Sequence, residues 1–355
     1  SGTTVVSPDL GNAKQTAMLG RLLGVPIALG AKERQSDERV TIGEITVFSG
    51  SAHPAFAQEM CDLLGVPLSP SRTTRFSNDC LQVQLQGNCR ERDVFLIQPL
   101  VPPVQENLVE LLFMLDAARG ASAGRITVVL PHYAYARSDK KDAPRISIGG
   151  RLVADLLQTA GAHRILAMTL HSPQVHGFFS VPVDHLHALR ELAGHFRGLN
   201  LSGTTVVSPD LGNAKQTAML GRLLGVPIAL GAKERQSDER VTIGSIIGEV
   251  TGRDIIVLDD EIARGTTIIE LLDRLAERGA RTVRVACTHG LFCDGALERI
   301  ASRPEVAEIV CTNTVPVPGD GKEPKLTVIS LAPALAEAIR RIHEGESVSA
   351  LFGPH

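Results

Sequence analysis

The sequence lacks most of the features that would assign a protein to a functional class at sight. Its formal net charge is −3, so it has no excess of positive charge and we expect no nucleic-acid partner. No apolar run is long enough for a transmembrane helix and no signal peptide is visible, so we predict a cytoplasmic protein without a membrane partner. The six cysteines show no Cys-x-x-Cys spacing, which argues against zinc sites and disulfides.

Two nucleotide-binding motifs are also missing. The sequence contains neither a Walker A motif nor a Gly-x-Gly-x-x-Gly fingerprint, so a bound nucleotide would have to be held by other means. What is present is an ordinary globular composition, with 43% hydrophobic and 21% charged residues. At 355 residues the chain is long enough for two α/β domains with proper cores.

One long repeat stands out. Residues 1–43 and 202–244 are identical at all 43 positions. Structural repeats drift in sequence and solenoids need several units, so we interpret residues 1–43 as an artefact of cloning or of sequence assembly, with a very recent duplication as the alternative. The second copy stands directly before an acidic strand, where the chain needs it. We therefore take residues 44–355, which number 312, as the functional unit.

Within this unit, short apolar runs alternate with helical patterns. The alternation predicts an α/β fold of parallel sheets with helices on both faces. The pattern occurs twice at similar length, so we predict an N-terminal domain at 44–185 and a C-terminal domain at 186–355. Strands are expected at 45–48, 81–86, 94–97, 126–130, 164–170, 204–207, 226–230, 255–258 and 282–286, and helices at 54–64, 107–118, 148–159, 186–197, 214–224 and 332–343.

The most informative stretch is residues 254–267. Four apolar residues make a candidate buried strand, and Asp259 and Asp260 follow it directly. A small-residue loop then ends at Thr267, which forms a capping-box pattern with Glu270 at the start of an amphipathic helix. Unpaired backbone N–H groups and the helix dipole at such a start favour phosphate binding. The two acids could hold ribose hydroxyls or a magnesium ion.

Three polar residues fall at the ends of predicted strands, namely His171, Asp210 and Asp259. Active sites of parallel sheets lie at the carboxyl ends of the strands, so we expect these residues to converge. Taken alone, a single histidine is more often structural than a ligand. Lys233 and Arg235 stand in a run of charged residues, which by itself could be a solvated loop.

Several short motifs, taken in order, carry a family resemblance. They are Phe48-Ser-Gly-Ser-Ala-His-Pro54, Arg75-Phe-Ser77, Arg92-Asp-Val-Phe95, Tyr135-Ala-Arg137, Leu170-His-Ser-Pro-Gln-Val-His-Gly-Phe-Phe179, Val207-Ser-Pro-Asp210, Thr288-His-Gly-Leu-Phe292 and the Asp259-Asp260 loop. Over nearly all of residues 44–355 the sequence resembles ribose-phosphate diphosphokinase, also called phosphoribosyl pyrophosphate synthetase. The resemblance implies two tandem phosphoribosyltransferase-like domains, each a mainly parallel sheet flanked by helices.

The resemblance also implies an activity. It would be transfer of the β,γ-diphosphate of ATP to the anomeric hydroxyl of ribose 5-phosphate, with magnesium, giving phosphoribosyl diphosphate and AMP. Phosphoryl transfer depends on positioning and on neutralising charge, which suits a Lys-x-Arg pair such as Lys233 and Arg235. The family tends to form dimers that build hexamers, so a homo-oligomer is expected.

Matched residue by residue, the resemblance assigns roles to four groups of residues. Magnesium would be held by His171 and Asp210. Catalysis would fall to Lys233, Arg235 and His171. The nucleotide would contact Phe76, Asn78, Cys80, Arg137 and Ser138, and ribose 5-phosphate would contact Asp259, Asp260, Ala263, Arg264, Gly265, Thr266 and Thr267.

Some positions depart from the family pattern. Asn78 and Cys80 stand where the family has two acids that grip the adenosine, and Thr169 stands where an Asp is usual. In the phosphate loop Ala263 replaces an acid, and Arg264 adds a cation beside the phosphate. These changes leave two alternatives open. One is a catalytically weakened paralogue that regulates an active synthetase, and the other is a phosphoribosyltransferase or diphosphokinase with an altered substrate.

Overall fold

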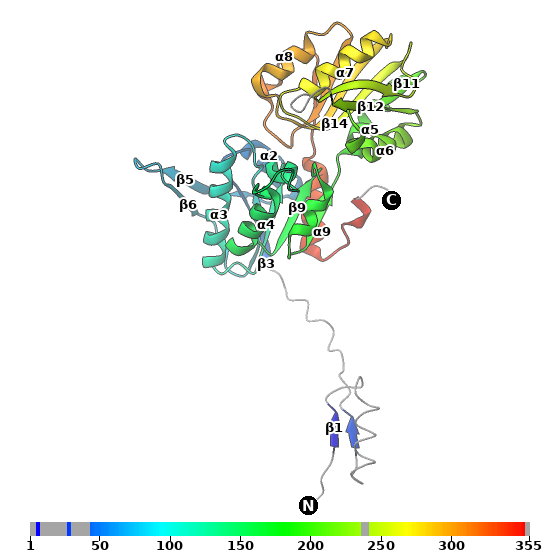
Figure 1. Cartoon of the computed structure of the whole chain (residues 1–355). Coiled ribbons are helices and arrows are strands. Elements are labelled where there is room, and N and C mark those ends of the chain that lie inside the picture. Colours follow the sequence, from blue (N-terminus) through cyan, green and yellow to red (C-terminus); the bar gives the residue numbers. More distant parts are fainter. Residues whose placement is uncertain (1–4, 8–26, 30–42, 236–240, 352–355) are drawn as a thin grey trace, which may run out of the picture. The chain divides into compact units, whose positions relative to one another are not determined.

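A computed structural model describes residues 5–7, 27–29, 43–235 and 241–351. The chain divides into two compact units, residues 1–42 and residues 43–355. In the first unit, β1 (Val5–Ser7) pairs in parallel with β2 (Ile27–Leu29). The larger unit holds the other described elements, shown in Figure 1.

The N-terminal half of the larger unit is built on a six-stranded sheet of order β10-β9-β8-β7-β3-β4. Adjacent strands of this sheet are parallel in each described pair. Its middle strands are aliphatic and mostly buried, as a sheet with both faces covered requires. The strands are β3 (Gly43–Ser49), β4 (Leu68–Ser69), β7 (Arg92–Ile97), β8 (Arg125–Leu130), β9 (Arg164–Met168) and β10 (Val183–Leu186).

Three helices connect these strands, namely α2 (Pro54–Leu64), α3 (Val104–Gly120) and α4 (Gly149–Ala160). Pro54 stands in the first turn of α2, and Gly65, with a φ of 68°, ends the helix where the sequence predicts. Two short 3-10 helices, η2 (Ala134–Arg137) and η3 (Pro173–Phe178), come after β8 and β9 at the carboxyl edge of the sheet. The predicted strand–helix alternation is therefore present in this half.

The C-terminal half contains a seven-stranded sheet of order β13-β12-β11-β14-β15-β16-β17. Among its described pairs β12–β13 is antiparallel and the others are parallel. The strands are β11 (Thr204–Ser208), β12 (Ile228–Arg235), β13 (Val241–Ile247), β14 (Asp254–Ile262), β15 (Thr282–Gly290), β16 (Val306–Thr312) and β17 (Leu326–Ile329). The helices are α5 (Leu189–Phe196), α6 (Ala214–Leu224), α7 (Thr266–Glu277) and α8 (Ala296–Ala301), with 3-10 turns η4 (Leu211–Asn213), η5 (Cys293–Gly295), η6 (Pro318–Gly321) and η7 (Ser349–Leu351).

One buried cluster joins the two sheets. It contains Val47 and Leu166 from the N-terminal sheet, Val206 and Ile256 from the C-terminal sheet, and Leu335 from α9 (Ala332–Glu344). Two other clusters fill the outer faces. One lies under α3 and α4, and the other lies under α7 and α8. The two halves therefore share a core layer and each has a second layer of its own.

The structure differs from the predicted domains at two points. Residue 185 lies inside β10, so the chain leaves the N-terminal sheet only after Leu186. Helix α9, expected in the C-terminal domain, packs against α2 of the N-terminal half. The carbonyl of Ile342 in α9 also accepts a hydrogen bond of 2.9 Å from Arg125 of β8. An amphipathic pattern shows that a helix has an apolar face but not which sheet buries it.

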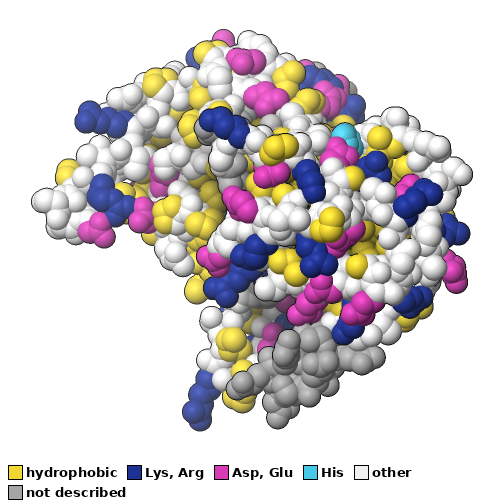
Figure 2. Space-filling view, turned by 90° about the horizontal axis from the view of Figure 1, so that it is seen from above, with side chains coloured by type: hydrophobic (Ala, Val, Ile, Leu, Met, Phe, Trp, Pro, Cys, Tyr) yellow, Lys and Arg dark blue, Asp and Glu magenta, His cyan; other side chains and the backbone are white. Residues whose placement is uncertain are grey.

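The surface of the larger unit carries one projecting element. Strands β5 (Ser71–Arg75) and β6 (Leu81–Leu85) form an antiparallel hairpin that extends away from the N-terminal sheet (Figure 1). The alternating exposure of β6 agrees with the half-exposed strand predicted at 81–86. On the face seen in Figure 2, Lys and Arg side chains lie interspersed with Asp and Glu. No helix within the described ranges is long and apolar enough to span a membrane.

Candidate active site

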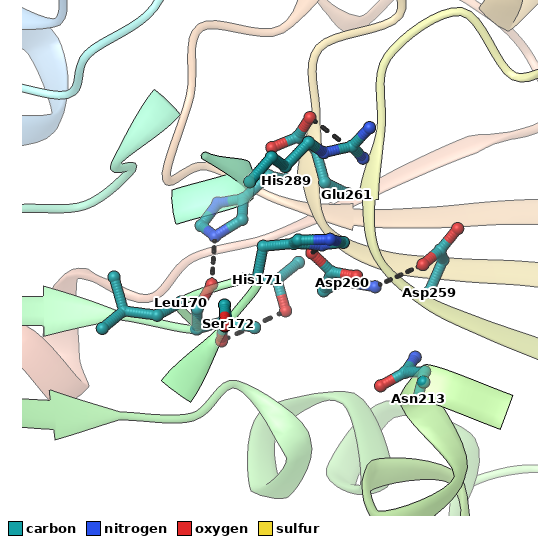
Figure 3. Close-up of polar contacts among 12 residues, drawn as sticks. Leu170, His171, Ser172, Asn213, Asp259, Asp260, Glu261 and His289 are labelled. Atoms are coloured by element: carbon teal, nitrogen blue, oxygen red, sulfur yellow. Dashed lines mark hydrogen bonds and ion pairs between the residues drawn. The ribbon is translucent and has the colours of Figure 1, made fainter. Parts of the chain in front are cut away.

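Strand ends from both halves of the unit meet at the candidate site. Strand β14 carries Asp259, Asp260 and Glu261 in succession, and His171 comes shortly after β9. The His171 Nδ1 atom lies 2.8 Å from Asp260 Oδ2, which links the two halves (Figure 3). Asp210 follows β11 and caps the 3-10 turn that ends at Asn213, whose side chain donates a hydrogen bond of 3.2 Å to the carbonyl of Leu258, the residue before Asp259. The predicted convergence of His171, Asp210 and Asp259 is therefore found.

The two adjacent acids of β14 differ in their electrostatics. Burial raises the pKa of Asp259, and the negative charge of Asp260 raises it further. Burial is the largest single influence on Asp260 and acts in the same direction, but the hydrogen bond with His171, the charge of His171 and the hydrogen bond with Asp259 together outweigh it and lower the pKa of Asp260. The hydrogen bond between Asp260 and His171 raises the pKa of His171. One carboxyl group is therefore kept ionised beside a histidine, and its neighbour takes up a proton more readily.

The loop after β14 leads into α7 through a glycine. Gly265 is the N-cap of α7 and has a φ of 69°, a conformation that residues with a Cβ rarely adopt. The capping box predicted for Thr267 and Glu270 is therefore wrong, because Thr267 already lies inside the helix. Glycine offers no side-chain acceptor to the first N–H groups of α7, so an anion can take that place.

A cavity of about 360 Å³ lies against this loop. Its volume is at the lower end of the range for small-molecule sites. Its walls come from both halves of the unit, and they are made by Arg137, Asp259, Glu261, Ile262, Ala263, Arg264, Gly265, Thr266, Thr267 and Ile268. The predicted sugar-phosphate residues are thus brought together, except that Asp260 is turned toward His171.

Arg264 is paired with an acid on the outer side of the loop. Its Nε atom lies 3.2 Å from Asp294 Oδ2, and 77% of its side chain is exposed. The Arg264 carbonyl accepts a hydrogen bond of 2.6 Å from Arg299 Nη2, which fixes the backbone of the loop. The cation that the sequence places beside the phosphate is therefore bound to Asp294 in this structure.

Two predicted nucleotide residues lie in or next to η2. Arg137 lines the cavity, and its Nη2 atom lies 3.2 Å from Glu261 Oε1. Ser138 Oγ accepts a hydrogen bond of 2.8 Å from the backbone N–H of Gly149. That bond joins η2 to the start of α4, so Ser138 supports the segment that carries Arg137.

The other predicted nucleotide residues lie elsewhere. Phe76, Asn78 and Cys80 are exposed at the tip of the β5–β6 hairpin, and Phe76 is 47% exposed. Asn78 Oδ1 accepts a hydrogen bond of 3.3 Å from the backbone N–H of Cys80, so its side chain supports the turn. None of the described residues that line the cavity belongs to this hairpin. The structure does not bring these three residues together with Arg137.

Lys233 and Arg235 lie at the end of β12, opposite Ile243 and Val241 of β13. The side chains themselves, and residues 236–240, fall outside the described part of the chain. The catalytic role of this pair stays a prediction.

Sequence reasoning missed a buried network beside the cavity. His132 Nε2 lies 2.9 Å from Glu261 Oε2, and His289 Nε2 lies 3.0 Å from the carbonyl of Thr169. Burial acts to raise the pKa of Glu261, but its hydrogen bond with His132 and the charges of His132, Arg137 and His289 together outweigh it and lower the pKa. The available signal was that Glu261 follows Asp259 by two residues, which puts both on one face of β14.

Comparisons with known proteins identify the family. Residues 45–161 match the N-terminal domain of ribose phosphate pyrophosphokinase, and residues 216–353 match the phosphoribosyl synthetase-associated domain. A Streptomyces coelicolor sequence assigned to ribose-phosphate pyrophosphokinase is 74% identical over 309 residues, which make up 87% of this chain and 98% of the relative. The chain belongs to the ribose-phosphate pyrophosphokinase family.

Other members of the ribose-phosphate pyrophosphokinase family agree. The enzyme of Deinococcus radiodurans is 49% identical over 313 residues, covering 87% of this chain and 98% of its own. The crystal structure of phosphoribosylpyrophosphate synthetase from Mycobacterium smegmatis has a TM-score of 0.80 at 39% identity, covering 85% of this chain and 99% of that one. The predicted α/β fold of two tandem phosphoribosyltransferase-like domains is confirmed.

The magnesium expected for this family can be compared with the donors present. Across residues 43–235 and 241–351, no three His, Cys, Asp or Glu side chains are grouped to hold a metal ion. Magnesium needs only one or two carboxylates when phosphate oxygens and water complete its shell. Asp210 and Asp260 are carboxylates whose negative charges both raise the pKa of the buried Asp259. The donors therefore fit a magnesium ion that arrives with a phosphate-bearing substrate.

Proposed function

We propose that this chain transfers the β,γ-diphosphate of ATP to the anomeric hydroxyl of ribose 5-phosphate, giving phosphoribosyl diphosphate and AMP. The observation that carries the proposal is the cavity at the end of β14 in a chain of this family. Carboxylates, a glycine-capped helix start and an arginine line that one space. These are the groups that a sugar phosphate and a nucleotide need.

The sugar phosphate would occupy the side of the cavity formed by the loop. The start of α7 behind Gly265 would bind the 5-phosphate through backbone N–H groups and the helix dipole. Asp259 would accept hydrogen bonds from the ribose hydroxyls. This arrangement would hold the anomeric hydroxyl at a fixed place, which is the main requirement of phosphoryl transfer.

The transferred diphosphate would meet positive charge from several directions. Arg137 would bind nucleotide phosphate from the N-terminal half, and Lys233 and Arg235 would stabilise the charge that develops during transfer. A magnesium ion held by His171 and Asp210 would supply further neutralisation of the phosphates. Asp260 would keep the His171 ring oriented through their hydrogen bond of 2.8 Å.

The exposed hairpin supports a proposal about assembly. Phe76, Asn78 and Cys80 lie on a projecting tip that does not line the cavity of their own chain. We propose that the protein forms a homo-oligomer, a dimer or a hexamer, in which this tip contacts a second copy. Sedimentation equilibrium of the purified chain measures its mass in solution, and a monomer at micromolar concentration would contradict the proposal.

Product analysis tests the activity. Incubation with ATP, magnesium and ribose 5-phosphate should yield AMP and phosphoribosyl diphosphate in equal amounts, and omission of ribose 5-phosphate should abolish both. Absence of both products with every common nucleoside triphosphate would refute the proposal. Consumption of phosphoribosyl diphosphate together with a base would favour a transferase instead. An inactive chain that changes the rate of an active synthetase would favour the regulatory alternative.

A further inference from the structure

Glu261 connects the two halves of the larger unit beside the cavity. It belongs to β14, whereas His132 and Arg137 both follow β8. Its Oε2 atom lies 2.9 Å from His132 Nε2, and its Oε1 atom lies 3.2 Å from Arg137 Nη2. The side chains of His132 and Glu261 are 3% and 9% exposed. The carboxylate therefore gives one oxygen to each partner in a place nearly closed to water.

His132 gives Glu261 a rigid support. Its Nδ1 atom lies 2.8 Å from the carbonyl oxygen of Leu100, so both ring nitrogens face acceptors. The ring also packs edge-on against His289, with 4.8 Å between the ring centres. Held from these sides, the imidazole fixes the position of the Glu261 carboxylate.

Arg137 is the most exposed partner in this group. Its side chain is 50% exposed and lines the cavity, on a 3-10 helix of only four residues. A guanidinium carries five N–H donors, so the contact with Glu261 leaves most of them for another anion. A long side chain loses rotamer freedom on binding, and a contact that orders it beforehand lowers that cost.

We propose that Glu261 is a positioning residue that holds Arg137 against the cavity wall, so that its remaining N–H groups meet a phosphate of the nucleotide. The inference rests on the proposed function, because it takes ATP as the ligand of Arg137. His132 has the indirect part of holding Glu261. The competing interpretation is that Glu261 only ties the two halves of the unit together.

The chain contains a matched control away from the cavity. Glu308 of β16 also lies between a histidine and an arginine. Its Oε1 atom is 2.9 Å from His195 Nε2, and its Oε2 atom is 3.6 Å from Arg284 Nε. Glu308 is 21% exposed and does not line the cavity. Glu308→Gln therefore removes the same charge between the same two kinds of partner as Glu261→Gln, but at a position away from the cavity.

The test begins with Glu261→Gln, which keeps the size of the side chain and one acceptor oxygen but removes the charge. Loss of a charge-assisted contact predicts that KM for ATP rises about tenfold. The value of kcat and KM for ribose 5-phosphate should change by less than about threefold. Glu308→Gln should leave all three values unchanged. Thermal unfolding of both variants shows whether either has lost stability.

A double-mutant cycle asks whether the effect passes through Arg137. In an Arg137→Ala background, Glu261→Gln should raise KM for ATP by no more than about twofold. A full additional effect there would overturn the proposal, as would an unchanged KM for ATP in the single variant. A lower unfolding temperature with unchanged KM would show that Glu261 is a structural tie. Should Glu261→Gln fail to fold, Arg137→Lys replaces it, and an unchanged KM for ATP in that variant would equally overturn the proposal.

Calorimetric titration with a non-hydrolysable ATP analogue and magnesium separates this inference from the proposed function. If the wild-type chain binds the analogue but forms no AMP, the proposed function fails and the affinities of the variants decide the inference. If the wild-type chain forms AMP while Glu261→Gln keeps its affinity for the analogue, only the inference fails. If the wild-type chain neither binds nor turns over, both fail.

Discussion

The two copies of one 43-residue sequence have different surroundings in the same chain. In the second copy, β11 pairs with β12 on one side and with β14 on the other. In the first copy, β1 pairs with β2, and these lie in a separate unit. The register of the common pair is the same, because Val5 lies opposite Ile27 just as Val206 lies opposite Ile228.

The local sequence determines the pairing of its own two strands, whereas the residues around that pair come from other parts of the chain. A strand, a crossover and a second strand suffice to set the register of their own pair. The third strand, β14, comes from outside the copied segment and supplies Asp259 and Glu261. Asp259 of that strand is an acidic neighbour of Asp210. The segment thus carries its pairing with it, but the candidate site depends on the rest of the chain.

The largest contrast between the copies is expected at the Lys-x-Arg pair. Lys233→Ala should lower kcat about 100-fold or more, because its charge is needed at the transferring group, with little change in KM for ribose 5-phosphate. Lys32→Ala, the same change in the first copy, should leave kcat as it is. Steady-state AMP release measures both variants. An undiminished kcat for Lys233→Ala would remove this pair from the mechanism.

A core substitution should affect stability in one copy and not in the other. Leu220 of α6 is fully buried. Leu220→Ala should lower the free energy of unfolding of the larger unit by about 2–5 kcal/mol, measured by urea denaturation. Leu19→Ala is the equivalent change in the first copy and lies in the other unit, so it should leave that transition unmoved. Similar shifts from both variants would mean that the two copies contribute alike to the core.

The part of the acid sensitivity that histidines cause should come from outside the copied segment, because neither copy contains a histidine. Burial, with the charge of His187, lowers the pKa of His185 from 6.5 to about 3. Below pH 6.5 the unfolded chain binds a proton there and the folded chain does not, so stability falls as the pH drops from 6.5 toward 3. The glutamine in His185→Gln can still accept the hydrogen bond from the Leu170 N–H. The substitution should therefore reduce the dependence of the unfolding midpoint on pH between 6.5 and 3. If the unfolding midpoint of the variant changed with pH as steeply as that of the wild-type chain, the role of His185 would be contradicted.

The smallest effect is expected from removing the first unit, which contains residues 1–42 of the first copy. Deletion of residues 1–42 takes away a separate unit and no described residue of the cavity. The values of kcat and KM should stay within about twofold, a spread that corresponds to less than half a kcal/mol. Intact mass spectrometry of the full chain confirms first that the copy is present. A clear loss of activity on deletion would show that the first copy takes part in function.

Much of the fold could be predicted because it depends on neighbours in the sequence. The apolar run at 255–258 gave the position of β14, and the amphipathic pattern after it indicated α7. Pro54 and Gly65 marked the ends of α2 for reasons of backbone geometry alone. The strand-end rule then brought His171 and Asp210 to the acids of β14.

The rest depends on contacts between distant segments. Glu261 and His132 are 129 positions apart, and no periodicity links them. The turn after β14 requires a left-handed residue, so Gly265 and not Thr267 caps α7. Helix α9 returns to the N-terminal half because α2 offers an apolar face there. A single sequence shows the faces of its elements but not their partners.

The core layer shared by the two sheets has a mechanical consequence. Val47, Val206 and Leu335 belong to one buried cluster, so a hinge motion between the sheets would expose apolar surface at about 25 cal/mol for each Å². The halves that carry Arg137 and Asp259 therefore form a stiff frame. Packing in this shared layer opposes any change in the distance between the two sheets.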